Sequence, residues 1–554
     1  MFSVKGLFSD NISIKIFLIF LFVIATNHLF VEQFNYFAVS DHPIRNSAVF
    51  LFIWLLSIVA CLAVALIPRF WVRLILALPI LISAYANELY LEIADENLEL
   101  SDVTNFWLSR ADYQSAIGNY WRSGISSLLY ILPGIIAFLL PVYRVPKKLI
   151  YTMMTVMIYL SVYGGVFVVV MLKGGAGARG FPEQFKTSSL LLNVVKEDMN
   201  NDFNAMRKRA PKNNNNELNR PNIVLIIDES VRGDYLSINK PDIGTTPYLT
   251  SIENKIINYG YASSGTICSN YSNAILRFGA SQGDISGTLL RNPSVWDYAV
   301  QTGYHTVYID SQKSFGTFQN FMALDERRFI DEFVQFDVES VQKTDDFVRK
   351  DREAAKIIRS LLGKRRPQFI ILNKEGAHAP YEGKYPSDQS IFTPHMKLGQ
   401  GISKSLDKKL LINSYRNAIY WTVDLFFKEL VDNLDLTNTV IIYTSDHGQN
   451  LLDRGVATHC SSNPPETVGL VPLFIITDHP DIKSKLKDKQ SLFYDRASHF
   501  NIIPTILEML NYKPASDSDP SLFEAPIGAR YFYSGNILQD KDIERFELSM
   551  ESDR

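Results

Sequence analysis

Long apolar runs fill the chain up to Leu172, and only short ones follow. Five of the long runs carry few charges and have about the length, roughly 20 residues, that crosses a bilayer as a helix. They are roughly Ile14–Phe30, Val49–Ile67, Phe70–Leu89, Gly124–Val142 and Leu149–Leu172. A single N-terminal run could be a cleaved signal peptide, but five in series cannot. The pattern therefore predicts a domain of five transmembrane helices over residues 1–172.

Basic residues gather at one set of the predicted helix ends. They are Lys5, Lys15, Arg69, Arg73, Arg144, Lys147 and Lys148. Loops on the cytoplasmic side of a membrane carry an excess of Lys and Arg, so we expect these ends in the cytoplasm. Five crossings that begin inside leave the rest of the chain outside the membrane.

Residues 173–221 are expected to bridge the membrane helices and a second domain. Lys173–Arg179 contains three glycines and is typical of a flexible exit from the membrane. Ser188–Arg209 has the pattern of an amphipathic helix, which would lie either on the membrane surface or in solvent as a connector. Pro211–Pro221 is polar and is expected to be a linker.

The pattern changes again at Asn222, where short β-branched runs alternate with helical stretches. The runs are 222–228, 305–310, 368–373, 439–446 and 470–477, and the clearest helical stretch is Leu406–Asn433. Continuous apolar strands separated by helices are typical of a sheet that is buried on both faces. Residues 222–554 are therefore predicted to form an α/β domain with a mostly parallel central sheet.

Charge and cysteine content narrow the function classes. The net charge of -3 gives no sign of a nucleic-acid partner. The chain has only three cysteines, Cys61, Cys268 and Cys460. A dense disulfide framework and a zinc site made of paired cysteines are both excluded.

Acidic and imidazole side chains follow the ends of several predicted strands. Glu229 follows the first strand, His378 follows 368–373, Asp446 and His447 follow the next, and His459 comes soon after. Ligands of such sheets bind at the carboxyl ends of the strands. Carboxylate oxygens with imidazole nitrogens form a zinc-type ligand set. An Asp-His pair alone could merely cap a helix, so the prediction depends on the combination.

The segment Ser263–Asn273 offers several candidate nucleophiles within a few residues. They are Ser264, Thr266, Cys268 and Ser269. A hydroxyl or thiol bound to a metal loses its proton near neutral pH, where a free hydroxyl is inert. A metal site beside this segment would therefore activate one of them.

These motifs together resemble those of the alkaline phosphatase/sulfatase superfamily, and specifically of bacterial phosphoethanolamine transferases that modify lipopolysaccharide. The matching pieces include IDESVRGDY at 227–235, SGTICSNYSN at 264–273, EGAHAPY at 375–381, SDHGQN at 445–450 and THC at 458–460. With the five predicted membrane helices, the resemblance covers nearly the whole chain.

The resemblance implies a zinc-dependent transferase in the bacterial inner membrane, with its catalytic domain in the periplasm. A nucleophile would take phosphoethanolamine, or a related phospho-alcohol, from a phospholipid such as phosphatidylethanolamine. It would then pass the group to an envelope lipid or glycan such as lipid A or lipopolysaccharide core. The implied zinc ligands are Glu229, Asp446, His447 and the nucleophile, and a second zinc ion stays open. His378 and His459 would contact the phosphoryl group or that second metal, and Lys313 and Asn373 would bind substrate.

The nucleophile is where this chain departs from its relatives, whose pattern is of the type CGT-x-T with a reactive Thr. Aligning Gly265 and Thr266 with that Gly–Thr puts Cys268 at the reactive position, while a gap would make Thr266 the nucleophile. We favour Cys268 as nucleophile and metal ligand, because a helix N-terminus and a metal both lower a thiol pKa. The alternative is that Cys268 pairs with Cys460, which would block thiol chemistry.

Two other functions fit the same fold. One is a membrane-bound phosphodiesterase or sulfatase-type hydrolase, in which water resolves the intermediate. The C-x-P/A-x-R signature of sulfatase maturation is absent after Cys268, which argues against a sulfatase. The other is a non-catalytic protein, but it would have no need to keep costly charged groups together.

Overall fold

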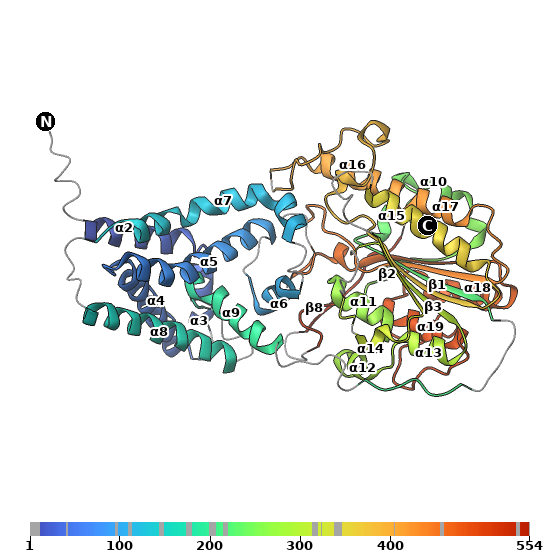
Figure 1. Cartoon of the computed structure of the whole chain (residues 1–554), viewed down its shortest axis with the longest axis horizontal. Coiled ribbons are helices and arrows are strands. Elements are labelled where there is room, and N and C mark those ends of the chain that lie inside the picture. Colours follow the sequence, from blue (N-terminus) through green and yellow to red (C-terminus); the bar gives the residue numbers. More distant parts are fainter. Residues whose placement is uncertain are drawn as a thin grey trace. The chain divides into compact units, whose positions relative to one another are not determined.

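The computed structural model describes most of the chain and divides it into two compact units. The units are residues 1–116 with 120–201, and residues 117–119 with 202–554. The described residues are 11–39, 42–94, 98–108, 113–142, 149–172, 180–198, 207–213, 220–312, 320–322, 324–336, 346–403, 405–454, 459–461, 463–538 and 543–552. Figure 1 labels the elements of both units.

The first unit is helical. Its helices are α2 (Asn11–Ala25), α3 (Phe30–Ala38), α4 (Pro43–Ala65), α5 (Phe70–Ala94), α6 (Leu100–Leu108), α7 (Tyr113–Leu139), α8 (Leu149–Leu172) and α9 (Glu183–Asp198). Among the described residues, α4, α5, α7 and α8 are each long and apolar enough to cross a membrane. Helices α2 and α3 pass that test only as a pair bent by 69°. Four predicted spans are thus confirmed as long apolar helices. The first predicted span is broken and not continuous, because α2 ends at Ala25, and it makes a fifth span only if α2 and α3 cross as one bent pair.

Two of the basic residues at the predicted cytoplasmic ends are buried against helix C-termini. The Lys15 Nζ donates hydrogen bonds to the carbonyl oxygens of Ala65 at 2.8 Å and Ala137 at 2.5 Å. The Arg73 Nε donates to the carbonyl oxygen of Phe138 at 2.7 Å. The last carbonyls of a helix have no partner within it and carry partial negative charge, so these cations stabilise the ends of α4 and α7. Lys5, Arg144, Lys147 and Lys148 lie outside the described residues.

Helix α9 corrects the predicted amphipathic helix over Ser188–Arg209. It runs from Glu183 to Asp198, and its side chains Phe185 and Leu190 are fully buried within the helical unit. The helix therefore packs against other helices and is neither a free connector nor a surface helix. Lys173–Arg179 lies outside the described residues, as does most of Pro211–Pro221.

The second unit is built on a seven-stranded sheet. The strands are β1 (Asn222–Asp228), β2 (Ile256–Ser263), β3 (His305–Asp310), β4 (Glu332–Gln335), β5 (Gln368–Asn373), β6 (Thr439–Ser445) and β7 (Leu470–Thr477), in the order β2-β7-β6-β1-β5-β3-β4. Strands β6, β1, β5, β3 and β4 are parallel, and β7 is antiparallel to both of its neighbours. The predicted α/β fold with a mostly parallel sheet is confirmed, and so are all five predicted strands.

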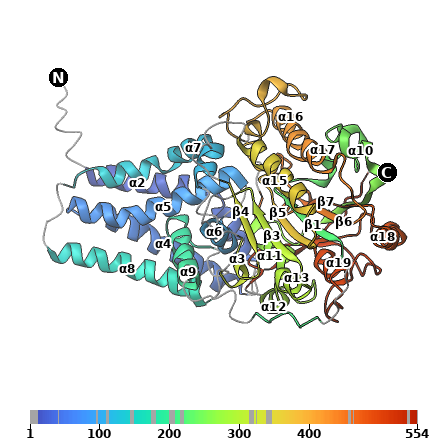
Figure 2. The ribbon, with the colours of Figure 1, turned by 45° about the vertical axis from the view of Figure 1, so that its right-hand side comes forward.

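Helices cover both faces of this sheet (Figures 1 and 2). On one side lie α11 (Ser269–Phe278), α12 (Ile285–Arg291), α13 (Val295–Gln301), α14 (Leu324–Arg327) and α19 (Ile502–Met509). On the other lie α10 (Pro247–Ser251), α15 (Asp346–Leu362), α16 (Lys408–Ile419) and α17 (Leu425–Val431). A π-helical turn, Tyr420–Asp424, joins α16 to α17, which confirms the predicted helical stretch. All seven residues of β1 are buried, as a sheet covered on both faces requires.

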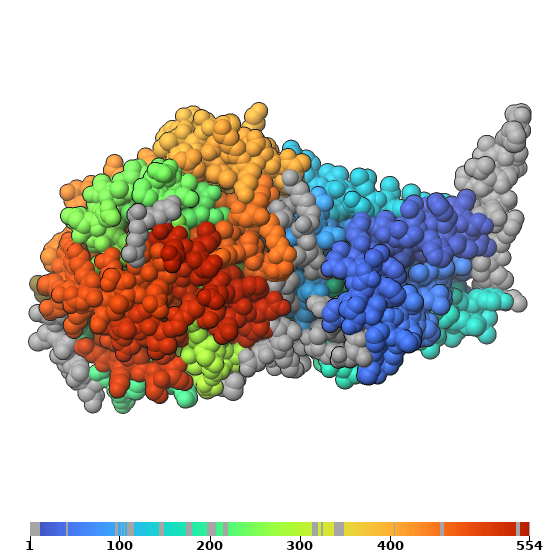
Figure 3. Space-filling model, turned by 180° about the vertical axis from the view of Figure 1, so that it is seen from behind, coloured from blue at the N-terminus to red at the C-terminus, as the bar shows by residue number. Residues whose placement is uncertain are grey.

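The C-terminal part of the chain packs onto this framework. It contains α18 (Pro480–Phe493) and a small antiparallel sheet of β8 (Tyr531–Ser534) and β9 (Glu544–Glu547). In the view from behind, its orange to red atoms cover much of the α/β unit (Figure 3). Tyr533 in β8 hydrogen-bonds the backbone of Gly265 and Ile267, so the C-terminal sheet braces the segment of candidate nucleophiles.

Candidate active site

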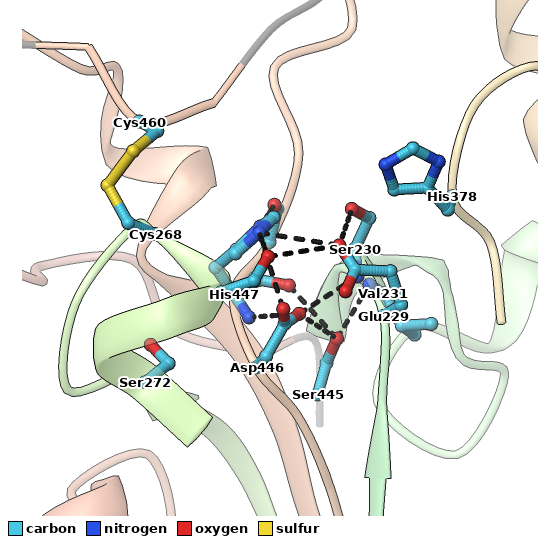
Figure 4. A network of polar contacts seen from close by, with 12 residues as sticks. Glu229, Ser230, Val231, Cys268, Ser272, His378, Ser445, Asp446, His447 and Cys460 are labelled. Atoms are coloured by element: carbon cyan, nitrogen blue, oxygen red, sulfur yellow. Dashed lines mark hydrogen bonds and ion pairs between the residues drawn. A yellow bond between two sulfur atoms is a disulfide. The ribbon is translucent and has the colours of Figure 1, made fainter. Parts of the chain in front are cut away.

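The sheet brings the predicted acidic and imidazole residues to one edge. Strands β1 and β6 are parallel neighbours, and their last residues, Asp228 and Ser445, are in register. The residues that follow them, Glu229 on one strand and Asp446 with His447 on the other, therefore leave the sheet side by side (Figure 4). The predicted convergence of these three residues is confirmed.

The distances within this cluster are short. The His447 Nε2 lies 3.5 Å from the Glu229 Oε1 and 3.5 Å from the Asp446 Oδ2. His459 joins them, because its ligand atom and those of Glu229 and His447 all lie within 4.8 Å of one another. Its ring also stacks on that of His447, with the ring centroids 4.1 Å apart. We call Glu229, Asp446, His447 and His459 the acid–histidine cluster.

Backbone groups and neighbouring side chains fix the orientation of each carboxylate. The Asp446 Oδ1 accepts hydrogen bonds from the backbone N–H groups of Ser230 at 3.1 Å and His447 at 2.7 Å. The Glu229 Oε1 accepts one from the Ser230 hydroxyl at 2.9 Å, and its Oε2 accepts one from the Gln312 Nε2 at 3.0 Å. Ser230 reaches both carboxylates from a left-handed backbone with φ of 59°. This conformation is rare for a residue other than glycine and is often found at functional sites.

The cluster leaves its inward-facing atoms available. Among the described residues, the buried Asp446 Oδ2 has no hydrogen-bond partner. The His447 Nδ1 lies 2.7 Å from the carbonyl oxygen of Gly448 and must donate its proton there, which leaves Nε2 as the nitrogen with a free lone pair. A metal-ligating histidine is usually oriented in this way by a bond from its other nitrogen.

The donor set fits a zinc ion. Zinc bound tetrahedrally to oxygen and nitrogen at about 2.0–2.1 Å places neighbouring ligand atoms about 3.3 Å apart. The two separations of 3.5 Å around the His447 Nε2 are close to this value. Burial raises the pKa of Glu229 to about 8, with a contribution from the Asp446 carboxylate, and burial raises that of Asp446 to about 6. A divalent cation would stabilise both ionised carboxylates and offset this effect.

Ser269 is the hydroxyl that meets this cluster. It is the first residue of α11, and its Oγ lies 3.1 Å from the His447 Nε2 and 3.4 Å from the Glu229 Oε1. Ser269 is one of the four candidates that the sequence offers, but the motif alignment favours its neighbours. The signal that would have selected it is the start of α11 directly after Cys268, because a helix N-terminus aims its first side chains and N–H groups at one point.

The prediction of Cys268 as nucleophile and metal ligand is wrong. Cys268 forms a disulfide with Cys460, so its sulfur is not available as a thiolate. The alternative pairing of these two cysteines is confirmed. Thr266 is not supported either, because it is 1% exposed and its hydroxyl bonds the carbonyl oxygen of Cys268 at 3.2 Å and the Ser272 hydroxyl at 3.0 Å. The Thr266 hydroxyl therefore forms hydrogen bonds within the turn that precedes α11.

The remaining predicted site residues have different outcomes. His378 is partly buried, and Figure 4 shows it near Glu229, on the other side of the cluster from the disulfide in this view. Asn373 is 1% exposed and its Nδ2 donates a hydrogen bond to the Asp310 Oδ1 at 3.3 Å, and its substrate contact stays a prediction. Asn373 also supports Gln312, whose Nε2 lies 3.5 Å from the Asn373 Oδ1. Lys313 lies outside the described residues.

His499 is a buried residue that supports the acid–histidine cluster without belonging to it. Its Nδ1 accepts a hydrogen bond from the backbone N–H of Gly265 at 2.9 Å, and its Nε2 lies 3.1 Å from the Thr444 hydroxyl. Burial lowers the pKa of His499 to about 3, so this ring is neutral. The ring connects the turn before α11 to the end of β6, and this connection helps to fix the positions of Ser269 and His447.

Comparison with known proteins agrees with this geometry. Residues 221–512 match the family model described as Sulfatase. The chain belongs to the sulfatase family. This sulfatase-family chain also resembles the Kdo(2)-lipid A phosphoethanolamine 7''-transferase of Salmonella typhimurium, with 24% identity over 57% of this chain and 56% of that one. It resembles the phosphatidylethanolamine transferase Mcr-1 of Escherichia coli, with 25% identity over 54% of this chain and 56% of that one.

A solved structure extends the likeness to the fold of both units. The integral membrane lipooligosaccharide phosphoethanolamine transferase A of Neisseria meningitidis matches with a TM-score of 0.59 and 16% identity, over 91% of this chain and 96% of that chain. The predicted resemblance to bacterial phosphoethanolamine transferases is thus confirmed. The sulfatase-family chain spans about half the length of the curated relatives it matches in sequence.

Proposed function

We propose that this protein transfers phosphoethanolamine from a membrane phospholipid, such as phosphatidylethanolamine, to an envelope lipid or glycan such as lipid A or lipopolysaccharide core. It would act from the bacterial inner membrane, with the α/β unit in the periplasm. The names of the sequence relatives and the apolar helices support this proposal. The observation that carries it is the Ser269 Oγ at 3.1 Å from the His447 Nε2, inside the buried acid–histidine cluster.

A zinc ion would be held by Glu229, Asp446, His447 and the Ser269 hydroxyl. When bound, zinc would lower the pKa of that hydroxyl and neutralise charge on the phosphoryl oxygens. Side-chain and backbone groups of the chain favour both effects. The Ser269 hydroxyl has one proton, and its Oγ lies 3.1 Å from the unprotonated His447 Nε2 and 3.4 Å from the Glu229 Oε1, the two groups placed to accept that proton. The first N–H groups of the ten-residue helix α11 favour negative charge at its N-terminus.

Transfer would take two displacements at phosphorus. In the first, the Ser269 Oγ forms a bond to phosphorus, and the bond to the diacylglycerol oxygen breaks. The leaving oxygen takes up the proton that Ser269 gives up, and His378, which Figure 4 shows near Glu229, is the candidate group to deliver it. In the second, an acceptor oxygen forms the new bond, the bond to Ser269 breaks, and Ser269 regains its proton. Charge spreads over the equatorial phosphoryl oxygens in each step, and the imidazoles stabilise it.

A transfer assay tests this function. The full chain with added zinc would be incubated with vesicles of phosphatidylethanolamine and lipid A, and the products identified by mass spectrometry. We expect lipid A that carries phosphoethanolamine, and diacylglycerol in equal amount. Release of free phosphoethanolamine, with unmodified lipid A, would instead identify a hydrolase and overturn the transferase proposal. The Ser269→Ala variant should give neither product, and Ser269→Thr should restore part of the transfer.

A further inference from the structure

The disulfide lies between two residues of the site. Cys268 directly precedes Ser269, and Cys460 directly follows His459. The two cysteines are separated by 192 positions in the sequence, and their Cα atoms are 4.8 Å apart. Figure 4 shows the bond at the border of the acid–histidine cluster. It therefore links the turn that carries the candidate nucleophile to the segment that carries a cluster histidine.

The Cys268 side of the bond is firmly anchored. The turn before α11 is held by the bond from the Gly265 N–H to the His499 Nδ1 at 2.9 Å. The Ile267 N–H donates to the carbonyl oxygen of Tyr533 in β8 at 3.3 Å. Cys268 itself is 4% exposed and is the N-cap residue of α11. This side can therefore act as a fixed point.

The Cys460 side has a different character. No described residue between Asp453 and Glu466 belongs to a helix or a strand. Cys460 has a φ of 64°, in the left-handed region that disfavours residues other than glycine, so tertiary contacts must maintain this conformation. The stacking of His459 on His447 and the disulfide are among the contacts that hold this segment.

We propose that the Cys268–Cys460 disulfide is a positioning clamp that keeps His459 at the acid–histidine cluster. The anchored turn before α11 fixes one end of the clamp, and the bond to Cys460 transmits that position to the next residue, His459. The cysteines act through His459 and do not touch substrate. The clamp rests on the metal site of the proposed function. Because the His459 ring stacks on the ring of the proposed ligand His447, the disulfide and His459 should contribute to zinc affinity as one unit.

A double-mutant cycle on zinc affinity tests this directly. Zinc dissociation constants would be measured by chelator competition on the full chain for the wild type, Cys268→Ala/Cys460→Ala, His459→Ala and the triple variant. Alanine is used because a free thiol at this place is itself a zinc ligand. Removing a group that orients or supplies a ligand typically weakens metal binding by about 10- to 100-fold. We expect zinc to bind about tenfold more weakly to Cys268→Ala/Cys460→Ala and to His459→Ala than to the wild type. The dissociation constant of the triple variant should be within about twofold of that of the weaker-binding of these two variants, since effects transmitted through one residue are not additive.

Two results would overturn the clamp. One is a Cys268→Ala/Cys460→Ala variant that binds zinc as tightly as the wild type. The other is a triple variant in which the two losses multiply, which would mean that the disulfide does not act through His459. The matched control is Cys61→Ala, because Cys61 is the free buried cysteine of the helical unit and its removal should leave zinc affinity unchanged.

A second preparation covers the case in which the alanine variants do not fold. The folded wild type would be reduced with a phosphine, which supplies two electrons, breaks the sulfur–sulfur bond and leaves two thiols that take up two protons. The thiols would then be capped with iodoacetamide, and zinc affinity should again fall about tenfold. Peptide mapping without reduction must show Cys268 linked to Cys460, and its failure to do so would also overturn the proposal. Zinc affinity needs neither lipid substrate, so a failed transfer assay would leave this test intact.

Discussion

The Asp446→Asn variant should stabilise the metal-free protein and weaken its response to zinc. The Asp446 carboxylate is 0% exposed, and burial raises its pKa to about 6. A rise from about 3.9 to about 6 corresponds to about 3 kcal/mol. The sign follows from the raised pKa, because the folded state disfavours the ionised form. This penalty is absent below pH of about 4 and complete above pH of about 6, so at neutral pH the neutral amide removes it.

Zinc should act in the opposite direction. The asparagine oxygen can keep the two backbone hydrogen bonds that the Asp446 Oδ1 accepts, but its NH₂ group replaces the unpartnered Oδ2. An NH₂ group is a donor and not a metal ligand. Zinc at about a thousand times its dissociation constant stabilises a protein by about 4 kcal/mol, and a variant that binds about 100-fold more weakly gains only about 1.4 kcal/mol. Zinc should therefore remove nearly all of the advantage that the variant has without metal.

Calorimetric unfolding at neutral pH, with a chelator and then with zinc, measures both effects. The exposed Asp388 provides a control, since Asp388→Asn should stay within about 0.5 kcal/mol of the wild type in both conditions. A metal-free Asp446→Asn variant that is less stable than the wild type would show that burial of the carboxylate is not a penalty. A variant that zinc stabilises as much as the wild type would show that Asp446 is not a zinc ligand.

Two further substitutions test the groups around the site. Lys374→Met should destabilise the protein by about 3–5 kcal/mol in denaturant unfolding, because Lys374 and Asp228 form a fully buried pair at 2.7 Å and the carboxylate would lose its partner. Lys356→Met, at a pair that is about half exposed, should leave the free energy of unfolding nearly unchanged, and equal losses in the two variants would contradict the distinction. Gln312→Leu removes the donor to the Glu229 Oε2 and should weaken zinc binding about tenfold by chelator competition, whereas unchanged affinity would show that this bond does not orient Glu229.

The strands that carry the site could be predicted because their composition leaves few alternatives. Strands β1 and β6 are rich in β-branched residues, and each is buried on both faces. The two strands of the central sheet that the sequence pattern does not predict, β2 and β4, lack this signature. Strand β4 has four residues and three of them are only partly buried, and β2 contains Gly260 with φ of 69° in an irregular register. A short edge strand and a bulged one do not show the pattern of a buried strand.

The nucleophile and the disulfide could not be predicted from the sequence, for a different reason. A spacing argument from Gly265 and Thr266 cannot show where α11 begins, and that start decides which hydroxyl meets the cluster. The disulfide joins residues that are 192 positions apart, so only the fold reveals it. The surroundings of α9 could not be predicted either, because an apolar helix face has the same sequence pattern whether lipid or another helix covers it.

The proposed transfer begins with attack of the Ser269 hydroxyl on the donor phosphorus. The most direct measurement is peptide mapping by mass spectrometry of the zinc-loaded protein after incubation with phosphatidylethanolamine and no acceptor. The structure predicts one phosphoethanolamine group, located on Ser269. An adduct on another side chain, such as Thr266 or a histidine of the cluster, would contradict this assignment, and so would diacylglycerol release that persists in Ser269→Ala.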